Sequence, residues 1–410
     1  MGHCLVKGRT LVAAIILLPA TCLMAQPRES QVLEEVLVVA QKRPQNLQLV
    51  PVSVAAISAG DLQVSGIKDV FDLASIAPGL EARQGGSANN TRFRIRSIGT
   101  SARNFGLESA VGLYVDGVYR ARQGSMVNNL VDMASIEVLR GPQGTLFGRN
   151  TLAGAVLMNT VAPDHDGHNG FLEVTAGNYD LLNVTGAASV SALEDTLALR
   201  ASGFSSQRDG YVDDIRLGDR AIYDRDRWGV RLQALYNPSR QLSVRVIADY
   251  SEIDESCCAA LVVQDNLRPV ALPPGATPYA GTDEVLRALG GTVFTGDQFY
   301  QYRTALTFLP QTENQDGGVT LNLEWLLADF TLTSITGYRT YDSDDNSDAD
   351  YTDLDALRLQ AQAEQEAWTQ ELRISAEGER ASYVAGLYYF KQHLHNLSST
   401  ETGADNNAIT

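Results

Sequence analysis

Residues 135–155 read SIEVLRGPQGTLFGRNTLAGA. The run begins with β-favouring apolar residues and passes straight into Arg140-Gly141-Pro142, with further glycines at 144, 148 and 154. Glycine reaches positive φ angles without steric cost, so this spacing favours backbone segments that turn tightly and approach one another closely. The stretch therefore predicts a compact, turn-rich domain at this point of the chain.

This run resembles the plug-domain motif of TonB-dependent outer-membrane receptors, the gated transporters of Gram-negative bacteria. Three further segments resemble the plug of that family, namely 51–54 (PVSV), 93–99 (FRIRSIG) and 111–119 (VGLYVDGVY). The resemblance implies a mixed α/β plug region over residues 46–165, with a helix-like stretch at 59–77. It also implies that residues 166–410 belong to the β-barrel around the plug.

Arg96 and Arg140 end strands in motifs that the family uses to dock the plug against the barrel wall. A buried guanidinium without a partner costs several kcal/mol, so each arginine is expected to meet a carboxylate that points into the lumen. Alternation in residues 366–376 places Glu371 on the polar face of that segment, so we expect Glu371 to be this partner. The alternative is that both arginines are solvated at the surface.

The N-terminus carries two predicted targeting and coupling features. Residues 1–25 have a basic start, a short apolar core and a small residue at Ala25, as a secretory signal peptide does. Cys22 raises a lipoprotein alternative, which the preceding Thr21 disfavours. Residues 26–45 then contain an apolar, β-favouring run flanked by charges, and such an extended peptide can add to an exposed sheet edge.

That run resembles the TonB box of the family. The resemblance implies that the C-terminal domain of TonB, within its inner-membrane energising complex, pairs in the periplasm with seven residues. They are Glu34, Glu35, Val36, Leu37, Val38, Val39 and Ala40. The alternative is that the run is an ordinary first strand of the plug.

From residue 170 onward the chain alternates apolar and polar residues with a period of two. In residues 242–251, for example, Val244 and Val246 share one face, while Arg245 and Asp249 share the other. Apolar-out and polar-in alternation in segments of about ten residues is typical of a transmembrane barrel. The pattern predicts strands at 170–177, 181–190, 195–208, 226–236, 241–252, 313–326, 329–341, 366–376 and 381–393.

Short predicted turns alternate with long predicted loops at 209–225, 253–312 and 342–365, as periplasmic turns and extracellular loops do. The fold class is therefore mainly β: an α/β plug followed by about nine strands of a 22-stranded antiparallel transmembrane barrel. Nine strands with an open edge leave backbone groups unpaired in lipid. We expect the chain to be the front part of a receptor, and the alternative function is a truncated fragment that transports nothing.

Other classes of function have little support in the sequence. The net charge of −17 disfavours nucleic-acid binding, and we find no arrangement of residues typical of an enzyme. The acidic run at 342–350 lacks the glycine and closing glutamate of a calcium loop, so we expect a solvated extracellular loop and no metal site. Cys257 and Cys258 form either a vicinal disulfide or a pair of free thiols.

The resemblance implies a receptor of the Gram-negative outer membrane that takes up a scarce ligand with energy from TonB. A ferric siderophore is the default small-molecule ligand, and vitamin B12, haem or an oligosaccharide are the alternatives. No cofactor is expected beyond an iron–siderophore cargo. The expected partners are TonB, this ligand, and outer-membrane lipid with lipopolysaccharide.

Overall fold

The computed structural model describes residues 37–85, 87, 90–100, 106–260, 286–378 and 381–405. The predicted signal peptide and residues 26–36 lie outside this part of the chain. The largest element is an antiparallel sheet whose nine strands pair in chain order. These are β11 (His168–Gly177), β12 (Leu181–Leu193), β13 (Leu197–Arg208), β16 (Arg225–Ser239), β17 (Leu242–Glu255), β19 (Gln311–Leu327), β20 (Phe330–Asp348), β21 (Leu357–Glu377) and β22 (Ser382–Thr402).

The two faces of this nine-stranded sheet differ in polarity, as the period-two pattern predicts. Apolar side chains are exposed on the outer face, where Leu232 is 59% and Leu387 76% exposed. Charged side chains on the inner face, such as Arg200 and Arg339, are buried. The nine predicted strands and the mainly β fold are therefore confirmed. No helix within the described ranges is long and apolar enough to cross a membrane.

The acidic run is the main departure from the predicted strand limits. Residues 342–348 continue β20 instead of forming a loop, because β19 and β21 flank them and pair with their backbone. Asp345 points inward and accepts hydrogen bonds from Thr312 Oγ1 and Ser87 Oγ, each at 2.7 Å, whereas Asp342 and Asp344 are exposed on the other face. Period-two alternation thus persists beyond the apolar part of the strand, and the prediction of a loop here was wrong.

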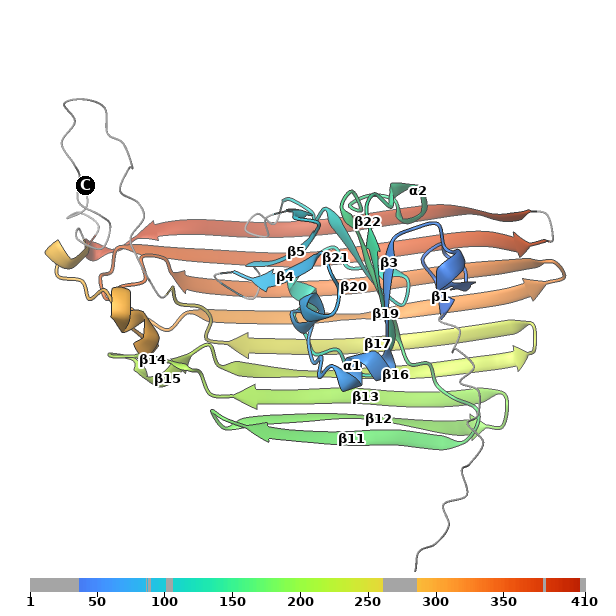
Figure 1. Cartoon of the computed structure of the whole chain (residues 1–410), viewed down its shortest axis with the longest axis horizontal. Helices are drawn as coiled ribbons and strands as arrows, with labels where there is room; N and C mark the ends of the chain where they lie inside the picture. The colour runs from blue at the N-terminus through green and yellow to red at the C-terminus, as the bar shows by residue number, and fades with distance from the viewer. Residues whose placement is uncertain are drawn as a thin grey trace, which may run out of the picture. The chain divides into compact units, whose positions relative to one another are not determined.

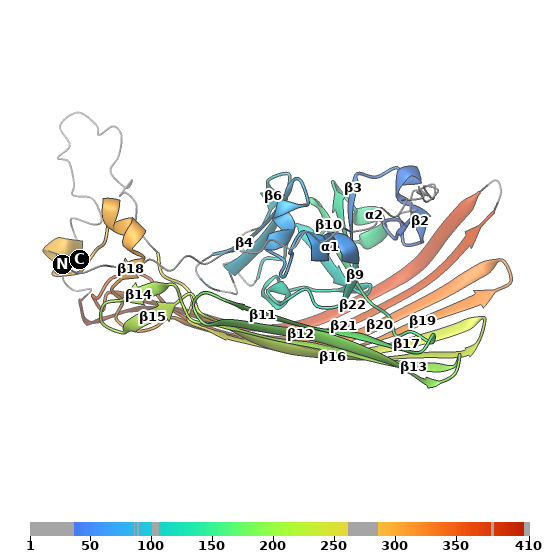
Figure 2. The same ribbon diagram turned by 60° about the horizontal axis from the view of Figure 1, so that its bottom comes forward.

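The plug region forms a separate α/β layer that lies on the concave face of the nine-stranded sheet (Figures 1 and 2). Its main sheet has the order β3-β9-β10-β7-β8, and β4-β5-β6 form a second one. The strands are β3 (Val54–Ser58), β4 (Leu80–Gln84), β5 (Thr91–Ile95), β6 (Ile98–Gly99), β7 (Val111–Val115), β8 (Val118–Tyr119), β9 (Met133–Arg140) and β10 (Gly154–Thr160). Phe93, Leu113 and Ile136 lie in its buried apolar core.

The helices of the plug region are short. The helix-like stretch at 59–77 forms only α1 (Ala59–Val64) and the 3-10 turn η2 (Asp72–Ser75), because the chain turns at Ser65-Gly66 with a φ of 66° at the glycine. Among the described residues of this region, further helical elements are η1 (Leu47–Leu49), η4 (Gly124–Met126) and α2 (Gly144–Phe147). Ser58 and Asp61 form a reciprocal capping box at the start of α1.

Smaller elements mark the two ends of the nine-stranded sheet (Figures 1 and 2). The pair β1 (Leu37–Val38) and β2 (Gln45–Asn46) lies toward the end with the short turns. At the other end β15 (Gly218–Ile222), β14 (Val212–Asp214) and β18 (Arg303–Thr304) form a small sheet, with η5 (Gly296–Gln301) nearby. Cys257 and Cys258 are joined as a disulfide after β17.

Candidate functional site

The plug region contacts the sheet first through the tip of one hairpin. β7 and β8 are joined by Asp116-Gly117, with φ angles of 48° and 84°. An Asp-Gly turn with two positive φ angles suits the twist of a two-residue hairpin. At Gly337 on β20 an added Cβ would lie 2.9 Å from the methyl groups of Val118, so glycine there lets hairpin and sheet approach closely.

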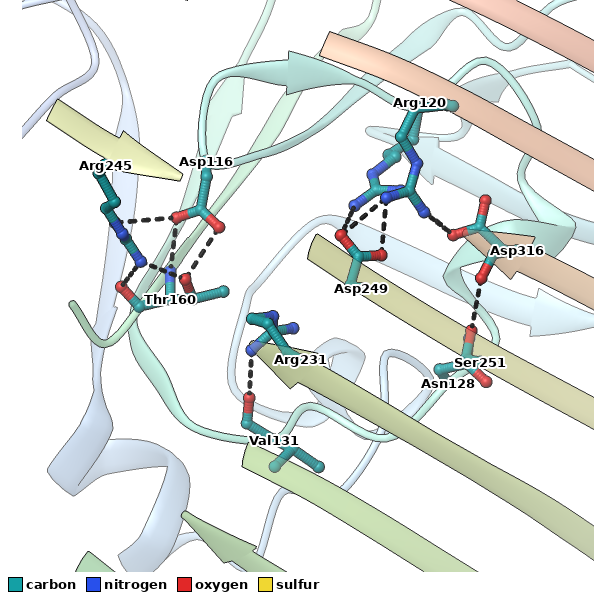
Figure 3. A network of polar contacts seen from close by, with 11 residues as sticks. Asp116, Arg120, Asn128, Val131, Thr160, Arg231, Arg245, Asp249, Ser251 and Asp316 are labelled. Atoms are coloured by element: carbon teal, nitrogen blue, oxygen red, sulfur yellow. Dashed lines mark hydrogen bonds and ion pairs between the residues drawn. The ribbon is translucent and has the colours of Figure 1, made fainter. Parts of the chain in front are cut away.

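Just beyond the hairpin, four charged side chains, three of them buried and that of Asp249 partly buried, join the plug region to three strands of the sheet. Arg120 lies 3.1 Å from Asp316 on β19 and 3.7 Å from Asp249 on β17 (Figure 3). Arg339 on β20 approaches the same two carboxylates, at 2.6 Å from Asp249. Its side chain crosses Gly318, where an added Cβ would lie 2.7 Å from Arg339 Cδ. Two cations thus neutralise two anions.

Further ion pairs of this interface reverse the polarity, with carboxylates on the plug region and arginines on the sheet. Asp116 accepts hydrogen bonds from Thr160 N (3.0 Å) and Oγ1 (2.8 Å), and Arg245 on β17 lies 3.5 Å from it (Figure 3). Asp132 receives two hydrogen bonds from Arg200 on β13, of 2.7 and 2.5 Å. Such two-point pairs fix orientation as well as charge.

Main-chain carbonyls complete the interface between these pairs. Arg227 donates to Val127 O at 2.7 Å, and Arg231 donates to Val131 O at 3.1 Å. Asn128 Nδ2 donates to Ser251 Oγ at 2.7 Å (Figure 3). Many of the contacts to β13–β20 thus come from one continuous segment, residues 116–132, which we call the docking strip, and Asp69, Ser87, Thr160 and Val161 add others.

The charges of the docking strip depend on one another. Burial lowers the pKa of Arg120 and the neighbouring Arg339 lowers it further, whereas Asp249 and Asp316 raise it. Removing one partner of a buried pair leaves an uncompensated charge and costs about 3–5 kcal/mol. The strip therefore holds the plug region firmly only while its ion pairs are complete.

A second contact involves residues 37–45, here called the N-terminal strap. β1 pairs with β2, so residues 39–44 form a loop between them. Val39 N donates to both carboxylate oxygens of Glu137 on β9, at 2.9 and 3.1 Å. Val38 and Ala40 on either side are each 1% exposed. Burial raises the pKa of Glu137 to about 7, and the bond from Val39 opposes that rise.

Lys42 ties the strap to the sheet. Its Nζ lies 2.9 Å from Glu371 Oε2 on β21 and 4.6 Å from the centre of the Phe147 ring. Burial lowers the pKa of Lys42, and the charge and hydrogen bond of Glu371 oppose this. Arg373 also contacts Glu371, at 2.5 Å. The strap is thus held by the plug region at Glu137 and by the sheet at Glu371.

Comparisons with known proteins fit this architecture. Residues 46–155 match the family model described as TonB-dependent Receptor Plug Domain. The chain is 34% identical over 151 residues to the pesticin receptor of Yersinia pestis, an alignment that covers 36% of this chain and 22% of that protein. Residues 46–155 are therefore a plug domain of the TonB-dependent receptor family.

Two further matches extend beyond the plug of this receptor. The iron-regulated outer membrane virulence protein of Vibrio cholerae is 27% identical over 233 residues, covering 52% of this chain and 33% of that one. The ferric yersiniabactin uptake receptor of Yersinia pestis shares the fold, with a TM-score of 0.70 at 19% identity. The matched region covers 86% of this chain and 50% of that receptor chain. The chain thus spans at most about half the length of these relatives. Like the Vibrio cholerae protein, whose name states that location, it is placed in the outer membrane.

The predicted site residues of the receptor lie in three different settings. Of the predicted TonB-binding residues, 37–40 lie in the strap and 34–36 lie outside the described residues. Arg96 is exposed in a turn at a φ of 52°, and Arg140 donates to Ser53 Oγ at 3.4 Å. Within the described part of the chain Glu371 pairs with Lys42 and Arg373, so its expected pairing with Arg96 or Arg140 is corrected.

Sequence reasoning missed most of the docking strip. It sought arginines on the plug and carboxylates on the barrel, whereas Asp116 and Asp132 offer carboxylates to barrel arginines. One signal was present, because Arg245 and Asp249 already fall on the polar face of a predicted strand. A charged residue in mid-strand on the lumen side needs a partner, and the plug motif that ends at Tyr119 runs directly into the strip.

Proposed function

We propose that this chain carries the plug and part of the barrel wall of a receptor for TonB-driven uptake of a ferric siderophore across the outer membrane. The observation that supports it best is the docking strip. A folded plug is held to a lumen wall by ion pairs and main-chain hydrogen bonds. Water can replace such bonds when the plug moves, so the attachment is firm and still reversible.

Moving the plug requires energy that ligand binding alone does not supply. A ligand shifts an equilibrium between two plug positions only by its difference in affinity for them. The buried pairs at Arg120 and Arg200 oppose separation of plug and wall. TonB, pairing with residues 34–40 in the periplasm, would supply the remaining work by pulling on the strap.

A ferric siderophore is the ligand class that the names of relatives favour. They include a pesticin receptor, an iron-regulated outer membrane virulence protein and a ferric yersiniabactin uptake receptor. Vitamin B12 is the second candidate, because the vitamin B12 transporter of Vibrio vulnificus is 25% identical over 205 residues. Lipid and lipopolysaccharide remain the proposed surroundings of the outer face.

The test is uptake by cells that express the receptor from its own locus. Radioactive iron would be supplied on yersiniabactin and on ferrioxamine B, with radioactive cyanocobalamin in parallel. We expect uptake of an iron complex that ends when tonB is deleted and when Val36→Pro removes a main-chain donor from the pairing segment. Val36→Ile is the matched control and keeps uptake. Uptake that persists without TonB would contradict the proposal, and uptake of cyanocobalamin alone would replace the siderophore with the second candidate.

A further inference from the structure

A group of short strands and loops, here called the cap, lies at the end of the sheet opposite the short turns (Figures 1 and 2). Long loops mark the extracellular end of such barrels. The cap consists of residues 211–223, 256–259 and 296–307, and it contains β14, β15, β18 and η5. Its apolar core is built from side chains that are at most 4% exposed, namely Val212, Ile222, Ala259 and Leu306. The cap therefore has a small core of its own.

The cap contacts the plug as well as the barrel wall. Gln84, the last residue of β4, donates from Nε2 to Cys257 Sγ at 3.3 Å. Figure 2 shows β4 on the side of the plug nearest the cap. Movement of the cap would therefore uncover this side of the plug.

Two carboxylates anchor the cap to the ends of wall strands. Asp224, between β15 and β16, accepts a hydrogen bond from Ser256 N at 2.6 Å. Asp348, the last residue of β20, accepts hydrogen bonds from Thr307 N at 2.9 Å and from Thr307 Oγ1 at 2.8 Å. The anchors hold different segments of the cap, so both must release before the cap can move as one body.

The surroundings of Asp224 favour its protonated form. Burial raises the pKa of Asp224 to about 6, and the bond from Ser256 opposes that rise. Further carboxylates add to the rise, namely Glu255, Asp254 and Asp226. Arg227 also faces Asp224, yet its guanidinium is bound to Glu255 by a hydrogen bond of 2.8 Å.

Asp348 has similar surroundings. Burial raises the pKa of Asp348 to about 6, the bonds from Thr307 oppose that rise, and the charge of Asp350 adds to it. Arg358 lies opposite Asp348 in the ladder of β20 and β21, but its guanidinium lies 3.1 Å from Asp355. Both anchors are thus acids that lose their protons closer to neutrality than exposed carboxyls do.

These pKa values make anchoring depend on pH. When the cap is released, the two carboxyls are solvated and their pKa returns toward 3.8. The anchored cap binds both protons more tightly, so anchoring is strongest below pH 3.8 and weakens as the pH rises through 6. For each carboxyl, pH 5 should favour anchoring about tenfold over pH 7.5.

We propose that the cap is a pH-dependent cover of the extracellular mouth, anchored to the wall in acid and released near neutrality. The proposal rests on the proposed function and adds a regulation of cargo entry to it. Ferric ions precipitate as hydroxide near neutrality and dissolve in acid, so a chelate is the main soluble source of iron at neutral pH. The cap would then uncover the plug under the conditions in which a chelate is needed.

The test combines exchange and distance measurements on the full receptor in outer-membrane fragments, without cargo or TonB. Hydrogen–deuterium exchange gives the protection factors of the Ser256 and Thr307 amides from pH 5 to pH 7.5. Double electron–electron resonance gives the cap–plug distance between spin labels at Tyr300→Cys on η5 and Arg83→Cys on β4, both exposed positions. A second pair, Arg83→Cys with Glu313→Cys on β19, gives the plug–wall distance as the control. The receptor without added cysteines gives the labelling background.

We expect both protection factors to fall about tenfold from pH 5 to pH 7.5. The cap–plug distance distribution should broaden over the same range, because the released cap samples more positions. The plug–wall distance should stay constant.

Asparagine variants assign the effect to its residues. Asp224→Asn keeps an acceptor for Ser256 N and should flatten the pH dependence of that amide, and Asp348→Asn should do the same for Thr307. Asp209→Asn, which removes an exposed carboxylate outside both anchors, is the matched control and should change neither profile.

Three results would overturn the proposal. They are protection factors that do not change with pH, a change that survives in both asparagine variants, and a pH-dependent amide exchange with an unchanged cap–plug distance. In the last case the anchors would gain protons without moving the cap. None of these measurements needs cargo or TonB, so a negative result leaves the proposed function standing. Failure of the proposed function would instead appear in the uptake assay, with the pH profile of the cap intact.

Discussion

The core of the plug and the docking strip lie side by side and are held by opposite means. In the core, Phe93, Ile95 and Ile136 are completely buried among apolar neighbours. In the strip, Arg120 and Asp132 are also buried, yet each is paired across the interface with charged residues of the barrel wall. Apolar packing therefore determines the shape of the plug. Polar contacts, which water can replace, determine its position against the barrel wall.

This difference has a direct mechanical consequence. Separating two apolar surfaces exposes both to water, at roughly 25 cal/mol per Å² of apolar area. Hydrogen-bonding groups that separate can be solvated by water, so their net contribution is only about 0.5–1.5 kcal/mol each. A pull on the strap should therefore disturb the strap and the interface before the core. The four predictions below test this division, from the largest effect to the smallest.

The core should respond most strongly to truncation. Phe93→Ala removes a completely buried ring and should lower the free energy of unfolding of the plug by about 4 kcal/mol. Hydrogen–deuterium exchange of β9 and β10 would measure this loss, and Phe93→Leu should have a smaller effect. Unchanged exchange in both strands would mean that this core does not hold the plug together.

Loss of an ion pair in the docking strip should loosen the interface between plug and barrel wall and leave the plug core unchanged. Arg120→Met leaves Asp249 and Asp316 with Arg339 as their one remaining close cation among the described residues, which should cost about 3 kcal/mol of plug attachment. Amide hydrogen–deuterium exchange should become faster in residues 116–132 and stay slow in β9 and β10. Arg120→Lys keeps the charge and should be milder. Unfolding of the whole plug by Arg120→Met would break the distinction between core and strip.

Glu137 should make strap docking depend on pH. Its pKa in the docked state, about 7, is raised above the ordinary value of 4.5 by burial. The docked state therefore binds the proton more tightly, so docking is strongest below pH 4.5 and weakens as the pH rises through 7. Between pH 5 and 8 the protection factor of the Val39 amide should fall by an amount worth about 2 kcal/mol. Glu137→Gln, which keeps an acceptor, should flatten this dependence, and a slope that survives the substitution would assign it to another group.

The smallest effect is expected at the cap of α1. Ser58 accepts a hydrogen bond from Asp61 N at 3.2 Å, and Asp61 bonds back to Ser58 N at 2.9 Å. Ser58→Ala should cost about 1 kcal/mol, visible as faster exchange in residues 59–64. Ser58→Thr keeps the acceptor and serves as the control. A larger loss that spreads to β9 would place this exposed helix inside the cooperative core.

Whether a feature of the fold or of the interface could be predicted depends on how far apart in the sequence its interacting residues lie. The wall strands were predictable, because each carries its own period-two signal; the acidic end of β20 was missed because its apolar alternation stops before the strand does. Glu371 was placed on the lumen face, yet its partner Lys42 is 329 residues away, among the charges that flank the predicted TonB-binding run, and no local pattern joins the two. The partners of Arg120 and Arg200 likewise depend on how two folded parts meet. A sequence reports which face a charge occupies more readily than which charge it meets.

The most direct test is hydrogen–deuterium exchange of the receptor with and without the purified C-terminal domain of TonB. The account predicts that, when the domain is bound, the amides of residues 38–45 lose their protection while those of β9 and β10 keep theirs. Continued protection of the strap in the TonB-bound receptor would contradict it, because residues 37–40 would then be docked on the plug and paired with TonB at once.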